Sequence, residues 1–177
     1  MHTPLSEALR SLGATTLPSD APPYARRLAD VVDRAVPALL AIGDDDSMRR
    51  LAPGKWSPRE IIGHLIDSAS NNHQRFVRMR TRDDLVVEGY QQDDWVSAQR
   101  YRESPWPELV VLWQLYNRHL GRVMSATPAA DRERERDDHN LDQRAFRAVP
   151  RERPTTLEYL MADYLDHLEH HLSRVLG

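Results

Sequence analysis

Apolar residues recur at helical spacing in four stretches of this chain, and each stretch predicts a helix that buries one face. The first runs from Tyr24 to Ile42, and Pro37 inside it is expected to kink the helix. The second follows Lys55, the third follows Pro105, and the last covers residues 157–176. Four amphipathic helices without a convincing strand segment predict an all-α four-helix bundle.

Capping signals and periodicity define the helices more closely. Ser57 suits an N-cap, and Glu60 three residues later completes a capping box. Thr155 or Thr156 is the expected cap of the last helix, with Glu158 as its first-turn acid. The inward positions expected in the second helix are Ile61, Leu65, Ser68, Ala69, Asn72, Phe76 and Met79, in the third Leu109, Leu112, Trp113, Tyr116, Leu120 and Val123, and in the last Leu157, Met161, Tyr164, Leu168, Leu172 and Val175.

The last helix carries two histidines at the i and i+4 positions. At about 100° per residue, His171 lies about 40° and His167 about 80° from the centre of the apolar stripe, whereas His170 faces solvent. Two imidazoles at this spacing can reach one transition metal ion at about 2.0–2.1 Å. Because the chain has eight histidines, such a pair also arises by chance, and two histidines at the rim of a bundle are the alternative.

A third histidine strengthens the metal interpretation. His64 lies about 60° from the apolar stripe of the second helix and about 10 Å from its start, and the terminal pair lies about 8–15 Å from the end of the last helix. The three rings can meet only if these helices are adjacent and antiparallel, which requires a crossover. We assign it to the link Thr81–Ser104. His119 would then lie about 20 Å from the metal end and is not expected to be a ligand.

The same topology places other residues. It brings Leu109, Trp113 and Tyr116 towards the metal end, where they are candidates for a pocket wall. Asp163 and Asp67 lie one helical turn from His167 and His64, respectively, and are candidate acceptors for the imidazole N–H groups.

Composition narrows the classes of function. With 177 residues, the chain is expected to form one domain, 1–177, with a loosely attached segment 1–23 in which Leu5–Leu12 forms a short helical turn. A net charge of −3 predicts no nucleic-acid partner, and the absence of cysteine excludes disulfides and thiolate ligands. No apolar run predicts a membrane span or a signal peptide, so a cytoplasmic protein is expected. The acidic stretch Gly43–Gly54 and the charge run 131–138 are interpreted as solvated segments.

The motif Trp56-Ser57-x-x-Glu60-Ile61-x-x-His64, followed by His167-x-x-x-His171, resembles the DinB-like superfamily, which includes bacillithiol transferases and mycothiol-dependent maleylpyruvate isomerase. The segment GYQQDDW, residues 89–95, is similar to the linker of that family. The resemblance implies an up-down-down-up bundle and a divalent metal ion on His64, His167 and His171. It also implies frequent dimerisation and attack on the substrate by a low-molecular-weight thiol or by water.

Three neutral imidazoles leave a divalent ion with an open coordination position, which is typical of catalytic sites. Together with the resemblance, which implies the thiol chemistry and the dimer, this leads us to expect a metal-dependent hydrolase or thiol S-transferase that acts on a small molecule as a homodimer. Zinc or nickel is the expected ion, and no further catalytic residue is assigned. Because the chain has no cysteine, a thiol would have to arrive as cosubstrate. The alternative is a non-catalytic dimeric bundle that serves as a binding or scaffold protein without a functional metal.

Overall fold

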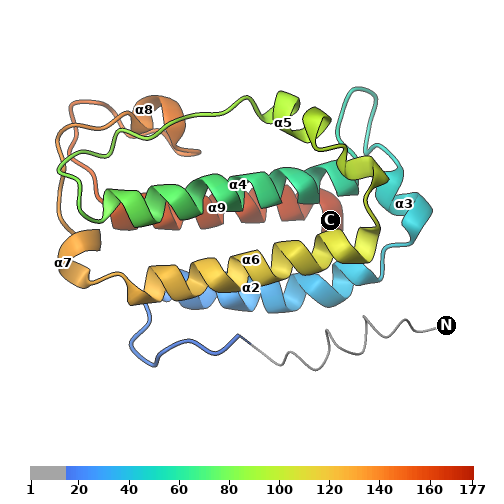
Figure 1. The fold of residues 1–177 in the computed structure, drawn as a ribbon, viewed down its shortest axis with the longest axis horizontal. Helices are drawn as coiled ribbons and strands as arrows, with labels where there is room; N and C mark the ends of the chain where they lie inside the picture. Colours follow the sequence, from blue (N-terminus) through green and yellow to red (C-terminus); the bar gives the residue numbers. More distant parts are fainter. Residues whose placement is uncertain (1–14) are drawn as a thin grey trace.

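A computed structural model of the chain describes residues 15–177, and four long helices dominate this part (Figure 1). They are α2 (Pro23–Leu40), α4 (Pro58–Met79), α6 (Trp106–Ala126) and α9 (Leu157–Leu176). Helices α4 and α6 run in one direction and α2 and α9 in the other (Figure 1). The chain is therefore an up-down-down-up four-helix bundle, and the predicted antiparallel packing of α4 against α9 is confirmed. The expected turn at Leu5–Leu12 lies outside the described residues.

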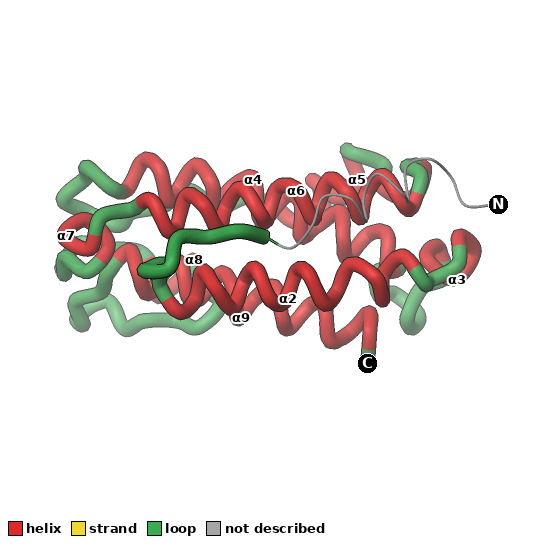
Figure 2. Tube along the Cα trace, turned by 90° about the horizontal axis from the view of Figure 1, so that it is seen from below, coloured by secondary structure: helices red, strands yellow, loops and turns green. Residues whose placement is uncertain are grey.

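Short helices occupy the connections, and the residues from 15 onwards form no strand, only two isolated β-bridges (Figure 2). One of these helices corrects a prediction. Helix α3 replaces the solvated turn expected after Gly43. The negative charges of three aspartates in its first turn stabilise this helix, because they lie at the positive end of the helix dipole. Asp44 also pairs with the buried guanidinium of Arg59. The short elements are α3 (Asp44–Met48), α5 (Gln92–Ala98), the 3-10 helix η1 (Tyr101–Glu103), α7 (Ala129–Arg132) and α8 (Leu141–Arg144).

The two predicted N-caps are present. Ser57 and Glu60 form the capping box of α4, and the side chain of Thr156 accepts a hydrogen bond from the backbone N–H of Tyr159 at the start of α9. The predicted inward positions of α4 are buried, and those of α9 are buried or half-buried. Both helices that carry the histidines are thus fixed at a defined start and rotation, as the sequence indicates.

The buried face of α6 differs from the prediction. Leu112 is 49% exposed, whereas Val110, Asn117 and Met124 are buried. Because α6 packs against both α2 and α4, its buried face is rotated towards these positions. Buried Asn117 is satisfied there, since its side-chain oxygen accepts a hydrogen bond of 2.6 Å from the hydroxyl of Tyr164.

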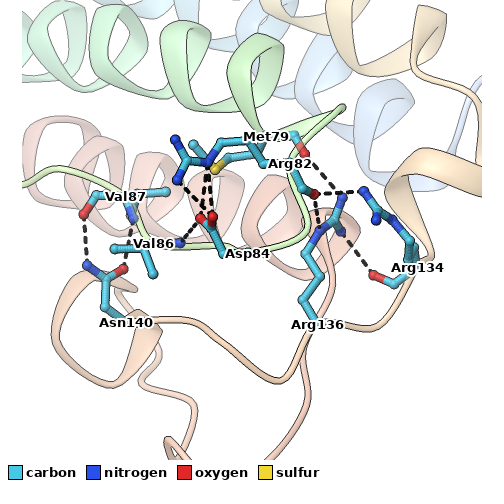
Figure 3. A network of polar contacts seen from close by, with 8 residues as sticks. All are labelled: Met79, Arg82, Asp84, Val86, Val87, Arg134, Arg136 and Asn140. Atoms are coloured by element: carbon cyan, nitrogen blue, oxygen red, sulfur yellow. Dashed lines mark hydrogen bonds and ion pairs between the residues drawn. The ribbon is translucent and has the colours of Figure 1, made fainter.

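The segment between α4 and α6 makes the predicted crossover, running back along the bundle to the end where α4 began (Figure 1). The connection between α6 and α9 holds it in place. The side chain of Asn140 donates to the carbonyl of Val87 and accepts from its N–H, at 2.9 and 3.0 Å (Figure 3). Leu85 adds a backbone hydrogen bond to Asp138. The two connections therefore form one layer over α4 and α9.

Arg136 anchors this layer and corrects the interpretation of the charge run 131–138 as solvated. Its side chain is buried and donates to four backbone carbonyls at 3.0–3.2 Å, and Figure 3 shows the hydrogen bonds to Met79, Arg82 and Arg134. One of these acceptors belongs to Met79, the last residue of α4, whose carbonyl lacks a partner within the helix. The four acceptors are the carbonyls of Met79, Arg82, Asp131 and Arg134.

Residues near the start of the described chain contact the bundle. The backbone N–H and the hydroxyl of Thr15 both donate to the carboxylate of Asp33 on α2. Leu17 packs beside Gly121 of α6. The part of segment 1–23 that the structure describes is thus attached to the bundle. Within that same range, residues 15–177, no helix has the length and apolar character needed to cross a membrane.

Candidate metal centre

The three predicted histidines meet between α4 and α9. One nitrogen from each of His64, His167 and His171 lies within 4.8 Å of the others. The Nε2 atoms of His64 and His167 are 3.3 Å apart, and the ring of His171 is centred 4.8 Å from that of His64 and 4.6 Å from that of His167. His64 is buried and the other two are half-buried. The antiparallel packing thus brings together residues more than 100 positions apart in the sequence.

Aromatic side chains from outside the long helices line the cluster. The indole ring of Trp56, just before α4, is centred 5.0 Å from the imidazole of His64. Phe146, just after α8, lies 5.6 Å from His167 in an edge-on arrangement. Tyr90 of the crossover lies 6.4 Å from His64. Tyr90 lies in the segment 89–95 that resembles the family linker, but neither Tyr90 nor Phe146 belongs to a periodic stretch, so sequence periodicity does not predict their contact with the histidines.

The two candidate acceptors for imidazole N–H groups bind elsewhere, so this prediction is wrong. Asp67 accepts hydrogen bonds from the hydroxyl of Tyr101, at 2.6 Å, and from the side chain of Gln99. Asp163 accepts the backbone N–H groups of Phe146 and Arg147, at 2.8 and 2.7 Å. Both carboxylates hold the connecting segments against the long helices. They act on the site indirectly, by fixing the walls around it.

Among the described residues, only one of the three clustered imidazoles has a polar side chain other than histidine near its Nδ1 atom. The hydroxyl of Ser68 lies 3.5 Å from the Nδ1 of His167. The Nδ1 atoms of His64 and His171 are buried and have no hydrogen-bond partner within the described part of the chain. Native proteins rarely leave such atoms unpaired. The Nδ1 atoms of His64 and His171 can therefore each still form a hydrogen bond, which no other described residue provides.

A cavity of about 340 Å³ opens beside the cluster, between the two long helices and the layer of connections. His64 and His167 form part of its wall, together with residues 89–92 and 143–146. The predicted wall residues Leu109, Trp113 and Tyr116 do not line this cavity, which corrects the prediction. Leu109 and Trp113 are core residues, because α6 packs on the opposite side of α4 from the connections.

Among residues 15–177, the candidate metal cluster does not include His119, in agreement with the prediction. Its Nε2 instead lies 3.4 Å from the Nε2 of His73, on the neighbouring helix α4. His119 is exposed and His73 is half-buried. The pair His73 and His119 can therefore serve as a control for metal binding at the three-histidine cluster.

Burial lowers the pKa of all three clustered histidines. It brings the pKa of His64 to about 4 and those of His167 and His171 to about 3, with mutual repulsion between the rings as a further cause for the terminal pair. The imidazoles are therefore neutral at pH 7. Neutral imidazole is the form that binds metal ions.

These pKa values predict how the stability of the metal-free protein depends on pH. In the unfolded chain an imidazole titrates near pH 6.5, so between about pH 6.5 and pH 4 the unfolded state binds protons that the native state does not. The free energy of unfolding therefore falls as pH falls through this window. We expect the melting temperature in chelator to drop from pH 7.5 to pH 5, and to drop less for His167→Gln. The control is His170→Gln at an exposed neighbour, which should match the wild type, and equal drops in all three proteins would contradict the assignment.

The geometry of the cluster fits a metal ion. Two nitrogens bound tetrahedrally at about 2.0–2.1 Å from one ion are about 3.4 Å apart, close to the 3.3 Å between the Nε2 atoms of His64 and His167. Ligation through Nε2 would leave each Nδ1 as an N–H donor, and Ser68 stands near that of His167. Three nitrogen donors without sulfur suit zinc, nickel, iron or copper.

Fold and site together define a four-helix bundle with a histidine cluster of the kind that holds a divalent ion. The chain belongs to the DinB superfamily, whose family model matches residues 27–175.

Relatives from Bacillus species extend this assignment. The chain is 24% identical to the Bacillus subtilis protein named "Putative metal-dependent hydrolase YfiT", over 69% of this chain and 63% of that protein. It is 27% identical to a Bacillus mycoides protein named "Putative metal-dependent hydrolase", over 50% of this chain and 53% of that protein. These alignments thus span less than two thirds of the length of either relative.

A solved structure shares the fold. It is that of Bacillus subtilis YfiT, described as a "probable metal-dependent hydrolase with an unusual four-helix bundle topology". It superimposes with a TM-score of 0.71 and 17% sequence identity, covering 93% of this chain and 91% of that one. The up-down-down-up arrangement is therefore common to both proteins.

Proposed function

We propose that this protein is a metal-dependent hydrolase that acts on a small molecule, with a divalent ion held by His64, His167 and His171. The convergence of these three imidazoles, two of which form part of a cavity wall, carries the proposal. The names of the two Bacillus relatives agree with it. When bound by three neutral imidazoles, a divalent ion with an open position lowers the pKa of water towards neutrality and so supplies a nucleophile near pH 7.

The surrounding side chains support such a reaction in three ways. Burial keeps the imidazoles neutral and hence free to bind an ion at neutral pH. The rings of Trp56 and Phe146 lie 5.0 and 5.6 Å from those of His64 and His167 and place apolar surface beside the site. Burial also raises the pKa of Tyr90 to about 12, so its phenol remains a hydrogen-bond donor towards a substrate oxygen in the cavity.

Turnover assays on metal-loaded protein test this function. The substrates are small esters and amides, and a parallel series combines a low-molecular-weight thiol with an electrophilic aryl halide. We expect hydrolysis without thiol, lost on chelation and in His167→Ala, and retained in His170→Ala. Turnover that requires the thiol would instead assign a thiol S-transferase, and a purified protein that binds no divalent metal would support the non-catalytic bundle.

A further inference from the structure

The charged residues in the cavity beside the three histidines indicate what it binds. Among the described residues, the charged side chains in its wall are those of Arg75, Arg144 and Asp163, apart from the neutral histidines. Two positive charges and one negative charge leave a net charge of +1. A cavity of about 340 Å³ is in the range that holds a small molecule.

Arg144, the last residue of α8, has a guanidinium group available for a ligand. Within residues 15–177 this guanidinium group forms no ion pair or hydrogen bond, and it lies against the backbone of Gly89 in the crossover. A methyl group at position 89 would collide with the Nη1 and Cζ atoms of Arg144. The absence of a side chain at Gly89 therefore lets the guanidinium group lie over the backbone at the cavity wall.

Arg75, on α4, is half-buried and faces the same cavity. Its guanidinium group donates to the backbone carbonyl of Glu88 and weakly to the side-chain oxygen of Asn72, at 3.4 Å. Neither acceptor carries a charge, and no carboxylate within the described range forms an ion pair with Arg75. Burial lowers its pKa, with the nearby Arg144 as a further cause, yet an arginine stays protonated at neutral pH.

The acid in the wall is already engaged. Both carboxylate oxygens of Asp163 accept backbone N–H groups, those of Phe146 and Arg147. Its charge thus stabilises the turn after α8 and forms no ion pair with either arginine of the wall. A guanidinium group without a carboxylate partner in the protein can form strong charge-assisted hydrogen bonds with the planar carboxylate of a ligand.

We propose that the substrate is a small carboxylate, bound between Arg75 and Arg144 with its reacting group towards the three histidines. This inference rests on the proposed function for the identity of the site, but the anion is held by the arginines and not by the metal ion. Specificity would then depend on Arg75, Arg144 and Gly89, which lie on three different segments of the chain.

Benzoate and benzamide, which share a shape and differ in charge, test the proposal. Each is titrated into the zinc-loaded protein and into chelator-treated protein, and binding is followed by NMR. A charged hydrogen bond supports about a tenfold preference. We expect benzoate to bind about tenfold more tightly than benzamide in both forms. Equal affinities would overturn the proposal. A preference present only with zinc would also overturn it, because the ion and not the arginines would then hold the carboxylate.

Variants locate the anion within the cavity. Arg75→Met and Arg144→Met should each lower benzoate affinity about tenfold, leave benzamide binding unchanged and retain full zinc content. Gly89→Ala should also lower benzoate affinity, because the added methyl group displaces the flexible end of the Arg144 side chain without disturbing the fold. The matched control is Arg151→Met, an exposed position outside the cavity wall. Unchanged benzoate binding in both arginine variants would overturn the proposal. Failure of the unaltered protein to bind zinc, with the benzoate preference intact, would count against the proposed function only.

Discussion

Replacing Arg136 with methionine is expected to destabilise the protein by about 3–5 kcal/mol, because it removes a buried charge from four carbonyls that have been arranged around it. The side chain is buried and donates to the carbonyls of Met79, Arg82, Asp131 and Arg134. Methionine fills a similar volume but offers no donor. The end of α4 and both connections would then retain buried acceptors without partners.

Urea unfolding followed by circular dichroism measures this loss. The matched control is Arg134→Met, since Arg134 is more exposed and pairs with the exposed carboxylate of Asp83. A surface pair of that kind contributes about 0–1 kcal/mol. If Arg136→Met lowered the free energy of unfolding no more than Arg134→Met, the anchoring role of Arg136 would be wrong.

The second large effect concerns metal affinity. His64→Ala should weaken zinc binding by at least about 100-fold, since even residues that only orient metal ligands change affinity about 10–100-fold. Competition with a chromophoric chelator gives the dissociation constant. His119→Ala is the control, because its Nε2 pairs with that of His73 outside the cluster. Equal weakening in both variants would place the ion elsewhere.

The sequence predicts the meeting of His64, His167 and His171 well, because it depends on local helix geometry. The i and i+4 spacing of His167 and His171 places both rings on one side of α9, and the cap at Ser57 fixes the depth of His64 in α4. Matching these depths required a crossover, and the structure has one (Figure 1). Periodicity and capping were thus sufficient for the helices that carry the ligands.

The features that the sequence does not predict depend on contacts between distant segments. Arg136 lies in a run of charged residues, and its burial depends on carbonyls that converge from three parts of the chain. Leu112 satisfies the helical stripe of α6, yet the presence of two neighbouring helices rotates the buried face away from it. Arg144 and Phe146 reach the cavity from a connection in which no periodicity indicates a direction.

One divalent ion is expected to bind His64, His167 and His171 together. Anomalous diffraction at the zinc edge, from crystals of zinc-loaded protein, locates that ion. We expect a dominant anomalous peak about 2.0–2.1 Å from one ring nitrogen of each of the three imidazoles. A dominant peak between His73 and His119, with none at the three-histidine cluster, would contradict it.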